Sequence, residues 1–327
     1  MTGQAWRRAR FVAGVLMSAG GLYLVFIGID WPALGAALGR VRLGWLLAAI
    51  VVEMVTLWVN AIRWRWIFWP HPQPAVGRLF GILGVAQLAN TVLPGRLGLP
   101  LRAVLAGEGP STSRATALTT LAVEKLLEGA TLLPIGLVLL FVIDLPDWLR
   151  AATALSGGLV LALLLIVTSG LRWREPLLAL AARWLPAWLS GVAVALFDGL
   201  DSLRSAKAGW RLWGWSFVYW LAVAAVNALV IEAVGIDVPL LASLVLLFVL
   251  QVGVRLPSTP ANLGIFEYLG TVSLGLFGIE KTPALGTMLL LHLVFYLPPS
   301  LLGVGYLLWT SMGLGQLRRA ALAMREP

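Results

Sequence analysis

Residues 90–102 read NTVLPGRLGLPLR, and this stretch decides how the chain can fold. It follows an apolar, helix-forming segment, yet it holds two prolines, two glycines and two arginines. Proline ends helices and glycine weakens them. Within a bilayer, non-helical backbone is tolerated only where protein buries it or where it lines a water-filled cavity. The stretch therefore predicts a break in membrane-embedded helical structure that faces the protein interior.

The composition of the whole chain agrees with a membrane setting. The 327 residues have a mean hydropathy of +0.90, and 12% of them are charged, against about 25% in soluble domains. Several apolar runs reach the roughly 20 residues that cross a bilayer core. We therefore predict an all-α polytopic membrane protein. The net charge of +9 comes from basic residues that mostly flank apolar runs, which favours headgroup contacts over nucleic-acid binding.

The chemistry that the residue types allow is narrow. The chain has no cysteine, and its two histidines, His71 and His292, are far apart in the sequence. A metal site is therefore not expected, and no cofactor is expected either. No phosphate-binding loop, nucleophile elbow or zinc-protease motif occurs. The acidic pair Asp198 and Asp201 is weak evidence for a magnesium-diphosphate site. Transport or an accessory role is therefore expected ahead of enzyme activity.

The apolar pattern divides into nine segments that could lie in the membrane. Two are unusual, since 79–93 is short for a span and 114–143 carries charges in its first half. Region 171–215 mixes apolar faces with basic residues and tryptophan, which is typical of amphipathic helices on a membrane surface, and a short span at 187–197 is the alternative. The apolar segments are 11–29, 43–62, 79–93, 114–143, 153–170, 216–234, 239–255, 261–279 and 284–311.

Basic residues predict the orientation, because they are enriched in cytoplasmic loops. Fifteen lie in the N-terminal arm, loop 63–78, region 171–215 and the C-terminal tail, and four lie in the opposite connections. This bias predicts that both termini are cytoplasmic. We expect one domain over 1–327, with a first half at about 1–170, the amphipathic region at about 171–215 and a second half at about 216–317.

A second break, RLPSTPANLGIFE at 255–267, has a rhythm similar to that of the first. The orientation favours a re-entrant hairpin at 79–105 that enters from the cytoplasm. The second region, from about Asp237 to Glu280, is either a hairpin from the outside or two full spans. Two hairpins of opposite orientation would form an inverted repeat, a common plan in transporters.

Arg96 and Arg102 are candidate ligands for a lipid headgroup, with Asn90 nearby in sequence. Guanidinium groups bind phosphate in a bidentate manner, and helix ends at a break offer free amide groups. The alternative is that both arginines reach the cytoplasmic interface and only anchor the hairpin.

The segment AVEKLLEG carries an intramembrane charge network. Glu124 and Glu128 share one helical face, and Lys125 can pair with Glu128. Charges in a span usually face the bundle interior. Arg96 or Arg102 is the expected partner of one glutamate, and proton coupling through a glutamate is a second hypothesis.

Around the second break, Arg255, Asn262 and Glu267 are candidates for substrate contact or for contact with the first hairpin. Ser258, Thr259 and Asn262 are candidate caps of a half-helix that starts near Leu263. The residues that we assign to the two backbone breaks are Pro94, Gly95, Gly98, Pro257, Pro260 and Gly264.

These residues together resemble the transmembrane region of the lysylphosphatidylglycerol synthase family, also called flippase-like domain proteins. Asn90, Pro94, Gly95, Gly98 and Arg102 match the first family motif, and Pro257, Pro260, Gly264 and Glu267 match the second. Glu124 and Lys125 match a polar helix of the family. Leu99 and Ala261 depart from it, where an acidic residue and a glycine are usual.

The resemblance implies a fold of about eight membrane-embedded segments and a role in moving or handling lipid, in a bacterial inner membrane. The full-length synthases carry a separate soluble domain that transfers the aminoacyl group, and none follows within these 327 residues, so lysyl transfer is not expected. We expect a translocase for an anionic or isoprenoid-type lipid, with membrane lipids as partners. The alternatives are a membrane-embedded lipid-modifying transferase or an accessory subunit of a lipid or glycolipid synthase. The sequence leaves the oligomeric state open.

Overall fold

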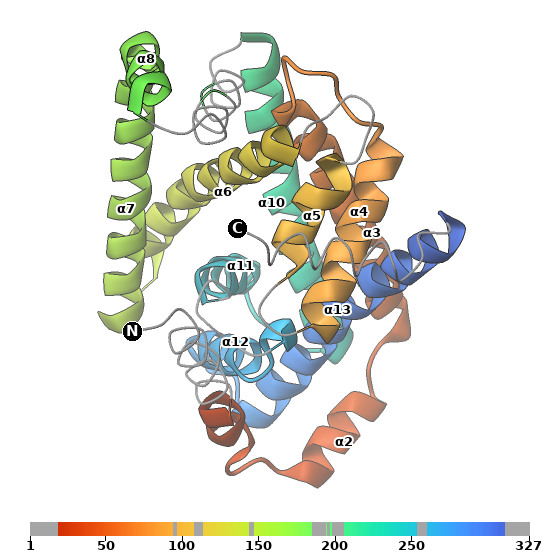
Figure 1. Ribbon diagram of the computed structural model, residues 1–327. Helices are drawn as coiled ribbons and strands as arrows, with labels where there is room; N and C mark the ends of the chain where they lie inside the picture. Colours follow the sequence, from red (N-terminus) through yellow and green to blue (C-terminus); the bar gives the residue numbers. More distant parts are fainter. Residues whose placement is uncertain are drawn as a thin grey trace, which may run out of the picture. The chain divides into compact units, whose positions relative to one another are not determined.

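The computed structural model describes residues 19–93, 97–107, 114–143, 147–184, 194, 197, 206–253 and 260–310. Within these ranges the regular structure is entirely helical (Figure 1), as the composition predicted. The elements are α2 (Trp31–Gly39), α3 (Leu43–Ile67), α4 (Val76–Val92), α5 (Gly98–Gly107), α6 (Arg114–Val142), α7 (Asp147–Arg172), α8 (Arg174–Trp184), α10 (Ala206–Val234), α11 (Leu241–Gly253), the 3₁₀ turn η1 (Pro260–Asn262), α12 (Ile265–Gly275) and α13 (Lys281–Trp309).

Four of these helices, α3, α6, α10 and α13, are long and apolar enough to cross a membrane. A fifth crossing is added if the helical pair Ala19–Phe26 and α2, which is bent by 89°, counts as one broken span. The membrane class is therefore confirmed. The count of about eight embedded segments and the re-entrant course of the hairpins stay predictions, since α4, α5 and α11 are shorter than a span.

The breaks in the helices follow from the local sequence. α4 ends at Val92, two residues before Pro94, and α5 starts at Gly98. The N-cap of α2 is Asp30, whose side chain accepts a hydrogen bond from the Ala33 amide at 2.9 Å. Such caps satisfy amide groups that the first turn of a helix leaves free.

The structure divides into two compact units. Unit 1 consists of residues 1–56, 87–97 and 220–301. Its apolar core gathers side chains from α3, α10, α11, α12 and α13, and α11 packs beside α12 (Figure 1). Near the start of α13, Lys281 Nζ donates hydrogen bonds to the carbonyl groups of Leu24, at 2.8 Å, and Ile27. These carbonyls lie at the end of the first helix, where such groups lack partners within the helix.

Unit 2 consists of residues 57–86, 98–219 and 302–327. α6 packs against α5 and against α7. Within this unit α4 and α13 meet at two glycines, because a Cβ atom on Gly84 would lie 2.9 Å from the Gly303 backbone nitrogen. Small residues at such crossings let helix backbones approach closely in membranes.

The boundary between the units falls inside four helices, α3, α4, α10 and α13, each of which contributes residues to both units. In region 171–215, α8 is an amphipathic candidate: Trp173, just before it, and Leu177, Leu180 and Trp184 within it, are exposed and recur at helical spacing. The alternative span at 187–197 lies outside the described residues, apart from Val194 and Phe197.

The structure corrects the expected loop at 63–78. α3 continues to Ile67, so Arg63 and Arg65 are helical, and Arg63 is fully buried. The segment IRWRWI at 62–67 places a large apolar residue on both sides of each arginine, which lets the helix continue. Arg63 is therefore not a loop residue of the kind that marks topology, and it belongs to the interior of unit 2.

Candidate functional site

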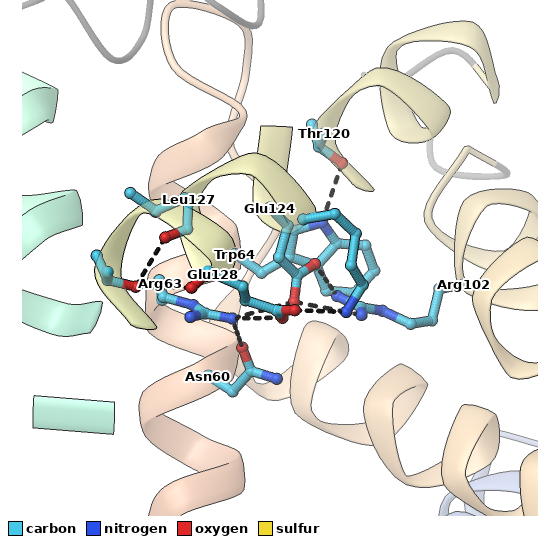
Figure 2. Close-up of polar contacts among 10 residues, drawn as sticks. Asn60, Arg63, Trp64, Arg102, Thr120, Glu124, Leu127 and Glu128 are labelled. Carbon is cyan, nitrogen blue, oxygen red and sulfur yellow. Dashed lines mark hydrogen bonds and ion pairs between the residues drawn. The ribbon is translucent and has the colours of Figure 1, made fainter. Parts of the chain in front are cut away.

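Five charged side chains form a cluster inside unit 2, and Figure 2 labels four of them with their neighbours. Arg63 comes from α3, Arg102 from α5, and Glu124, Lys125 and Glu128 come from α6. The two glutamates are one helical turn apart, so both carboxylates face the same side of α6, as predicted. We call these five residues the charge cluster.

Arg63 is the centre of the charge cluster. Its Nη2 atom lies 3.2 Å from Glu124 Oε1 and 3.2 Å from Glu128 Oε1. The same nitrogen donates to Asn60 Oδ1 at 3.0 Å, from the preceding turn of α3. The guanidinium carbon lies 4.5 Å from the centroid of the Tyr219 ring, which adds a cation–π contact.

Arg102 binds Glu124 with both terminal nitrogens. Nη2 lies 2.6 Å from Oε2, and Nη1 lies 3.4 Å from Oε1. The guanidinium carbon stands 4.1 Å from the centroid of the Trp64 ring, whose Nε1 donates to Thr120 Oγ1 at 3.0 Å. The ring is thus held between α3 and α6 and presents its face to Arg102. The expected pairing of Arg102 with a glutamate is confirmed.

Glu128 joins the remaining cation to the charge cluster. Its Oε2 atom accepts from Lys125 Nζ at 2.7 Å, the i,i+3 pair that the sequence predicted. The Lys125 side chain is half exposed, at 51%, whereas the Arg63 side chain is fully buried. The charge cluster therefore extends from the fully buried Arg63 to the half-exposed Lys125.

The charges in the cluster do not cancel. Three cations face two carboxylates, so the formal sum is +1. Arg63 Nε and Nη1 and Arg102 Nε are buried and have no hydrogen-bond partner among the described residues. Unpaired buried donors are costly, and such groups in native proteins are often found where a ligand or water binds. The charge cluster therefore has donor nitrogens that its own ion pairs do not use.

The structure describes only some of the residues that the sequence groups with Arg102. Gly98 is the buried first residue of α5, and Asn90 is half-buried near the end of α4. Arg96, together with Pro94 and Gly95, lies outside the described residues, and so do Arg255, Pro257, Ser258 and Thr259. Pro260 is described in the backbone only, as the first residue of η1.

The second break forms a separate polar group within unit 1. Glu267 Oε2 accepts a hydrogen bond from the Gly264 amide at 2.6 Å and so caps α12, which starts at Ile265. Asn262 was a candidate cap, but it donates instead to the Tyr296 hydroxyl at 2.7 Å. The other Glu267 oxygen, Oε1, lies 2.6 Å from His292 Nδ1. The partner of Glu267 is thus a residue of α13.

Sequence reasoning missed two residues of these groups. Arg63 was read as a loop residue, although Glu53, Asn60 and Arg63 are spaced by seven and three positions and so share one face of a helix. His292 was considered only as a metal ligand. The signal that would have found it is its place within an apolar 29-residue helix, since an ionisable group in a span is a functional candidate by default.

The chain has membrane-length helices, and unit 2 contains a buried network of arginines and glutamates. These two features are those of an α-helical integral membrane protein with a polar interior. The family description "Lysylphosphatidylglycerol synthase TM region" matches residues 11–303. The chain therefore belongs to this family, as the motifs of both breaks indicated. Comparison with curated proteins and with solved structures gave no match.

Proposed function

We propose that this chain is a lipid translocase of the bacterial inner membrane, which moves an anionic or isoprenoid-type lipid between leaflets. The observation that carries the proposal is the charge cluster: five charges of formal sum +1, four of them buried and Lys125 half exposed, on α5 and on the membrane-length helices α3 and α6. Charged groups at such a position are expensive and mark substrate or ion pathways. The family, whose name refers to a lipid product, supports a role in lipid handling.

The geometry suggests how an anionic headgroup would be received. Arg102 already uses both terminal nitrogens on Glu124, so a phosphate would not meet a free guanidinium fork. It would instead contact the unpartnered nitrogens, Arg63 Nε and Nη1 and Arg102 Nε. The carboxylates would hold the two guanidinium groups in place, while the excess positive charge attracts the anion.

This model limits how tightly the headgroup binds. The two glutamates compete with the phosphate for the same cations, so the bound state is never a fully satisfied ion pair. A transported group must bind well enough to enter and weakly enough to leave. We propose that Glu124 supplies this balance by neutralising most of the charge of Arg102.

The test is a flipping assay in proteoliposomes with lipids that carry a fluorescent headgroup label. Arg102→Gln should lower the rate at which labelled phosphatidylglycerol becomes accessible to dithionite by roughly tenfold or more, because a hydrogen bond to a charged group is worth about 1.5–3 kcal/mol. Arg211→Gln is the matched control, since Arg211 lies over the Trp66 and Trp210 rings in the same unit. Flipping by Arg102→Gln at the wild-type rate would remove Arg102 from the mechanism.

Lipid identity is tested in parallel arms. Vesicles that contain labelled phosphatidylglycerol, phosphatidylcholine or an isoprenoid phosphate should differ, with the anionic lipids moved faster than the zwitterionic one. Mass spectrometry of the same vesicles covers the alternative function: a chemically modified lipid would identify a transferase, and no flipping together with co-purification of a synthase would identify an accessory subunit.

We also propose that both termini are cytoplasmic. Because the chain has no cysteine, single cysteines can be placed at will. A cysteine added before Met1 or after Pro327 should react with an impermeant maleimide only after cells are lysed. Reaction in intact spheroplasts would reverse the orientation.

A further inference from the structure

The pair Glu267 and His292 is buried in unit 1 and is not part of the charge cluster. The Glu267 side chain is 2% exposed and the His292 side chain 12%. Oε1 and Nδ1 lie 2.6 Å apart, within the distance of an ion pair, and neither atom has a hydrogen-bond partner among the described residues. The contact is an ion pair only while the imidazole carries a proton on both nitrogens, so it depends on the protonation state of His292.

The pair is tied to the backbone of the second break. Glu267 holds the Gly264 amide through its other oxygen. The His292 ring stacks on Tyr296, with centroids 4.3 Å apart, and the Tyr296 hydroxyl accepts from Asn262. A closed chain of contacts thus runs from Gly264 through both titratable groups to Asn262. Opening the Glu267–His292 contact releases the break from α13 on one side.

The backbone inside this chain of contacts is strained. Ala261 has a φ of 58°, in the left-handed region that alanine disfavours, and Asn262, whose residue type tolerates this region, follows with a φ of 59°. Such residues persist only where the surroundings hold them, and they cluster at switches and ligand sites. The break is therefore a segment that relaxes when its restraint is removed.

The first break has a related tether with a different chemistry. There the short helix after the break, α5, carries Arg102, which binds Glu124 on the next long helix, 22 positions later. After the second break the short helix α12 carries Glu267, which meets His292 on the next long helix, α13. An arginine keeps its charge at all accessible pH values, whereas histidine changes charge in the physiological range. Of these two tethers, the Glu267–His292 pair is the one with a cation that a proton can create or remove.

We propose that the Glu267–His292 pair is a proton-binding site, and that loss of the proton frees the break at 260–264 from α13. With a neutral imidazole that carries hydrogen on Nδ1, the pair has a net charge of −1. Addition of a proton to Nε2 gives an imidazolium beside a carboxylate, with a net charge of zero. A lone buried charge is costly and a matched pair much less so, so the protonated pair stays closed and the deprotonated pair opens towards water.

The other titratable groups around the pair are few. On the same two helices they are Tyr268, Tyr296, Tyr306 and Lys281, which binds the Leu24 and Ile27 carbonyls at the start of α13. From α3, Glu53 is buried, and its helix contributes Ala49 to the apolar core that also contains Phe266 of α12. From α10, Glu232 pairs with Arg42 at 3.8 Å. α11 contributes Ser243 and Gln251, which do not titrate, and Tyr23 of the first helix is exposed. Glu53 is thus the rival proton acceptor.

The proton is observed directly by NMR of ring-labelled histidine in lipid nanodiscs. The chain has two histidines, so His71→Gln leaves His292 as the single signal. We expect a doubly protonated ring at the acidic end of a series between about pH 5 and pH 9, the range in which histidine switches, and a singly protonated ring at the other end. A ring that stays neutral or stays charged throughout this series would overturn the proposal.

Release of the break is measured by cysteine labelling in the same series. Leu263→Cys reports on the break, and Leu240→Cys, an exposed position in the same unit, corrects for the reactivity of the thiol itself. The ratio of the two labelling rates should rise severalfold as pH rises, over the interval in which the second ring proton leaves. His292→Asn, whose amide can still donate to Glu267, should make the ratio independent of pH.

Two outcomes of the labelling experiment would also overturn the proposal. One is a flat ratio in the parent protein. The other is a pH response that survives in His292→Asn and disappears in Glu53→Gln, which would place the proton on Glu53. Circular dichroism and gel filtration check that each variant is folded. The proton site would supply energy coupling for the proposed translocase, and its role in transport rests on that function. The NMR and labelling tests use no transport, so they can fail while the flipping assay succeeds, and the reverse.

Discussion

A single nitrogen of Arg63 bridges Glu124 and Glu128, at 3.2 Å from each, although the two glutamates follow it by 61 and 65 positions. The side chain of Arg63 therefore links α3 to two successive turns of α6. The predictions below begin with this bridge, because a buried charge is stable only while its partners remain.

Removal of one carboxylate should destabilise the protein strongly. Glu124→Gln leaves Arg102 without its bidentate partner and Arg63 with Glu128 alone. Loss of one partner of a buried ion pair costs about 3–5 kcal/mol, because the remaining charge is uncompensated. Thermal unfolding in detergent measures the loss. Lys125→Gln is the control: its side chain is half exposed, and such pairs contribute about 0–1 kcal/mol. Equal losses in the two variants would contradict the burial argument.

Replacement of both partners separates stability from function. In Arg102→Met with Glu124→Met, no buried charge loses its only partner, since Arg63 keeps Glu128. Such replacements are often neutral or stabilising by about 1–4 kcal/mol. We expect the double variant to unfold at or above the temperature of Arg102→Met alone, yet to flip anionic lipid no faster than Arg102→Gln. Recovery of both stability and flipping would show that this ion pair serves the fold only.

Ala261→Gly should stabilise the protein. With φ at 58°, Ala261 stands where glycine carries no steric cost, and left-handed backbone costs other residues about 1–2 kcal/mol. The greater conformational freedom of glycine in the unfolded chain offsets about 0.5–1 kcal/mol of that cost. We therefore expect the free energy of unfolding to rise by several tenths to about 1 kcal/mol. Ala222→Gly, in the middle of α10, should instead lose about 1 kcal/mol. Denaturant titration of both variants gives the signs, and a loss at both sites would refute the strained conformation.

Gly303→Ala should weaken the contact between α4 and α13 in unit 2. The added Cβ would collide with the Gly84 carbonyl group, which cannot move aside as a flexible side chain could. Overpacking of this kind costs about 1–3 kcal/mol. Two residues later, Gly305 has open space where its Cβ would be, so Gly305→Ala should be neutral or slightly stabilising. Thermal unfolding of the pair tests the contact, and identical midpoints would show that the helices do not meet there.

Much of the fold could be predicted from the sequence, because helix formation in a membrane is dictated locally. Apolar runs gave α6 and α13 within a few residues, and Pro94 with Gly98 marked the gap between α4 and α5. Two helix ends were wrong: α10 starts at Ala206, where the apolar run predicted 216, and α3 ends at Ile67, where it predicted 62. The two arginines in IRWRWI are typical of a loop, but partners on another helix keep Arg63 inside, and local sequence cannot show a partner 61 positions away.

The charge cluster was half predicted for the same reason. Glu124, Lys125 and Glu128 lie within one turn of each other, so helical periodicity alone places them on one side of α6. The match of Arg102 to Glu124 was one of several pairings that the sequence left open. The partner of Glu267 was not predicted, since spacing does not indicate that α12 and α13 bring a carboxylate to His292.

The bonds from Lys281 to the end of the first helix bear on how the protein is made. Lys281 follows Leu24 by 257 positions, and a ribosome that adds about 5–20 residues per second needs roughly 10 to 50 s to cover that distance. Throughout that interval the carbonyls of Leu24 and Ile27 must be satisfied by water, by lipid headgroups or by the insertion machinery. The first helix is thus synthesised early and completed late, and a ribosome stalled before Lys281 would leave it exposed to quality-control proteases.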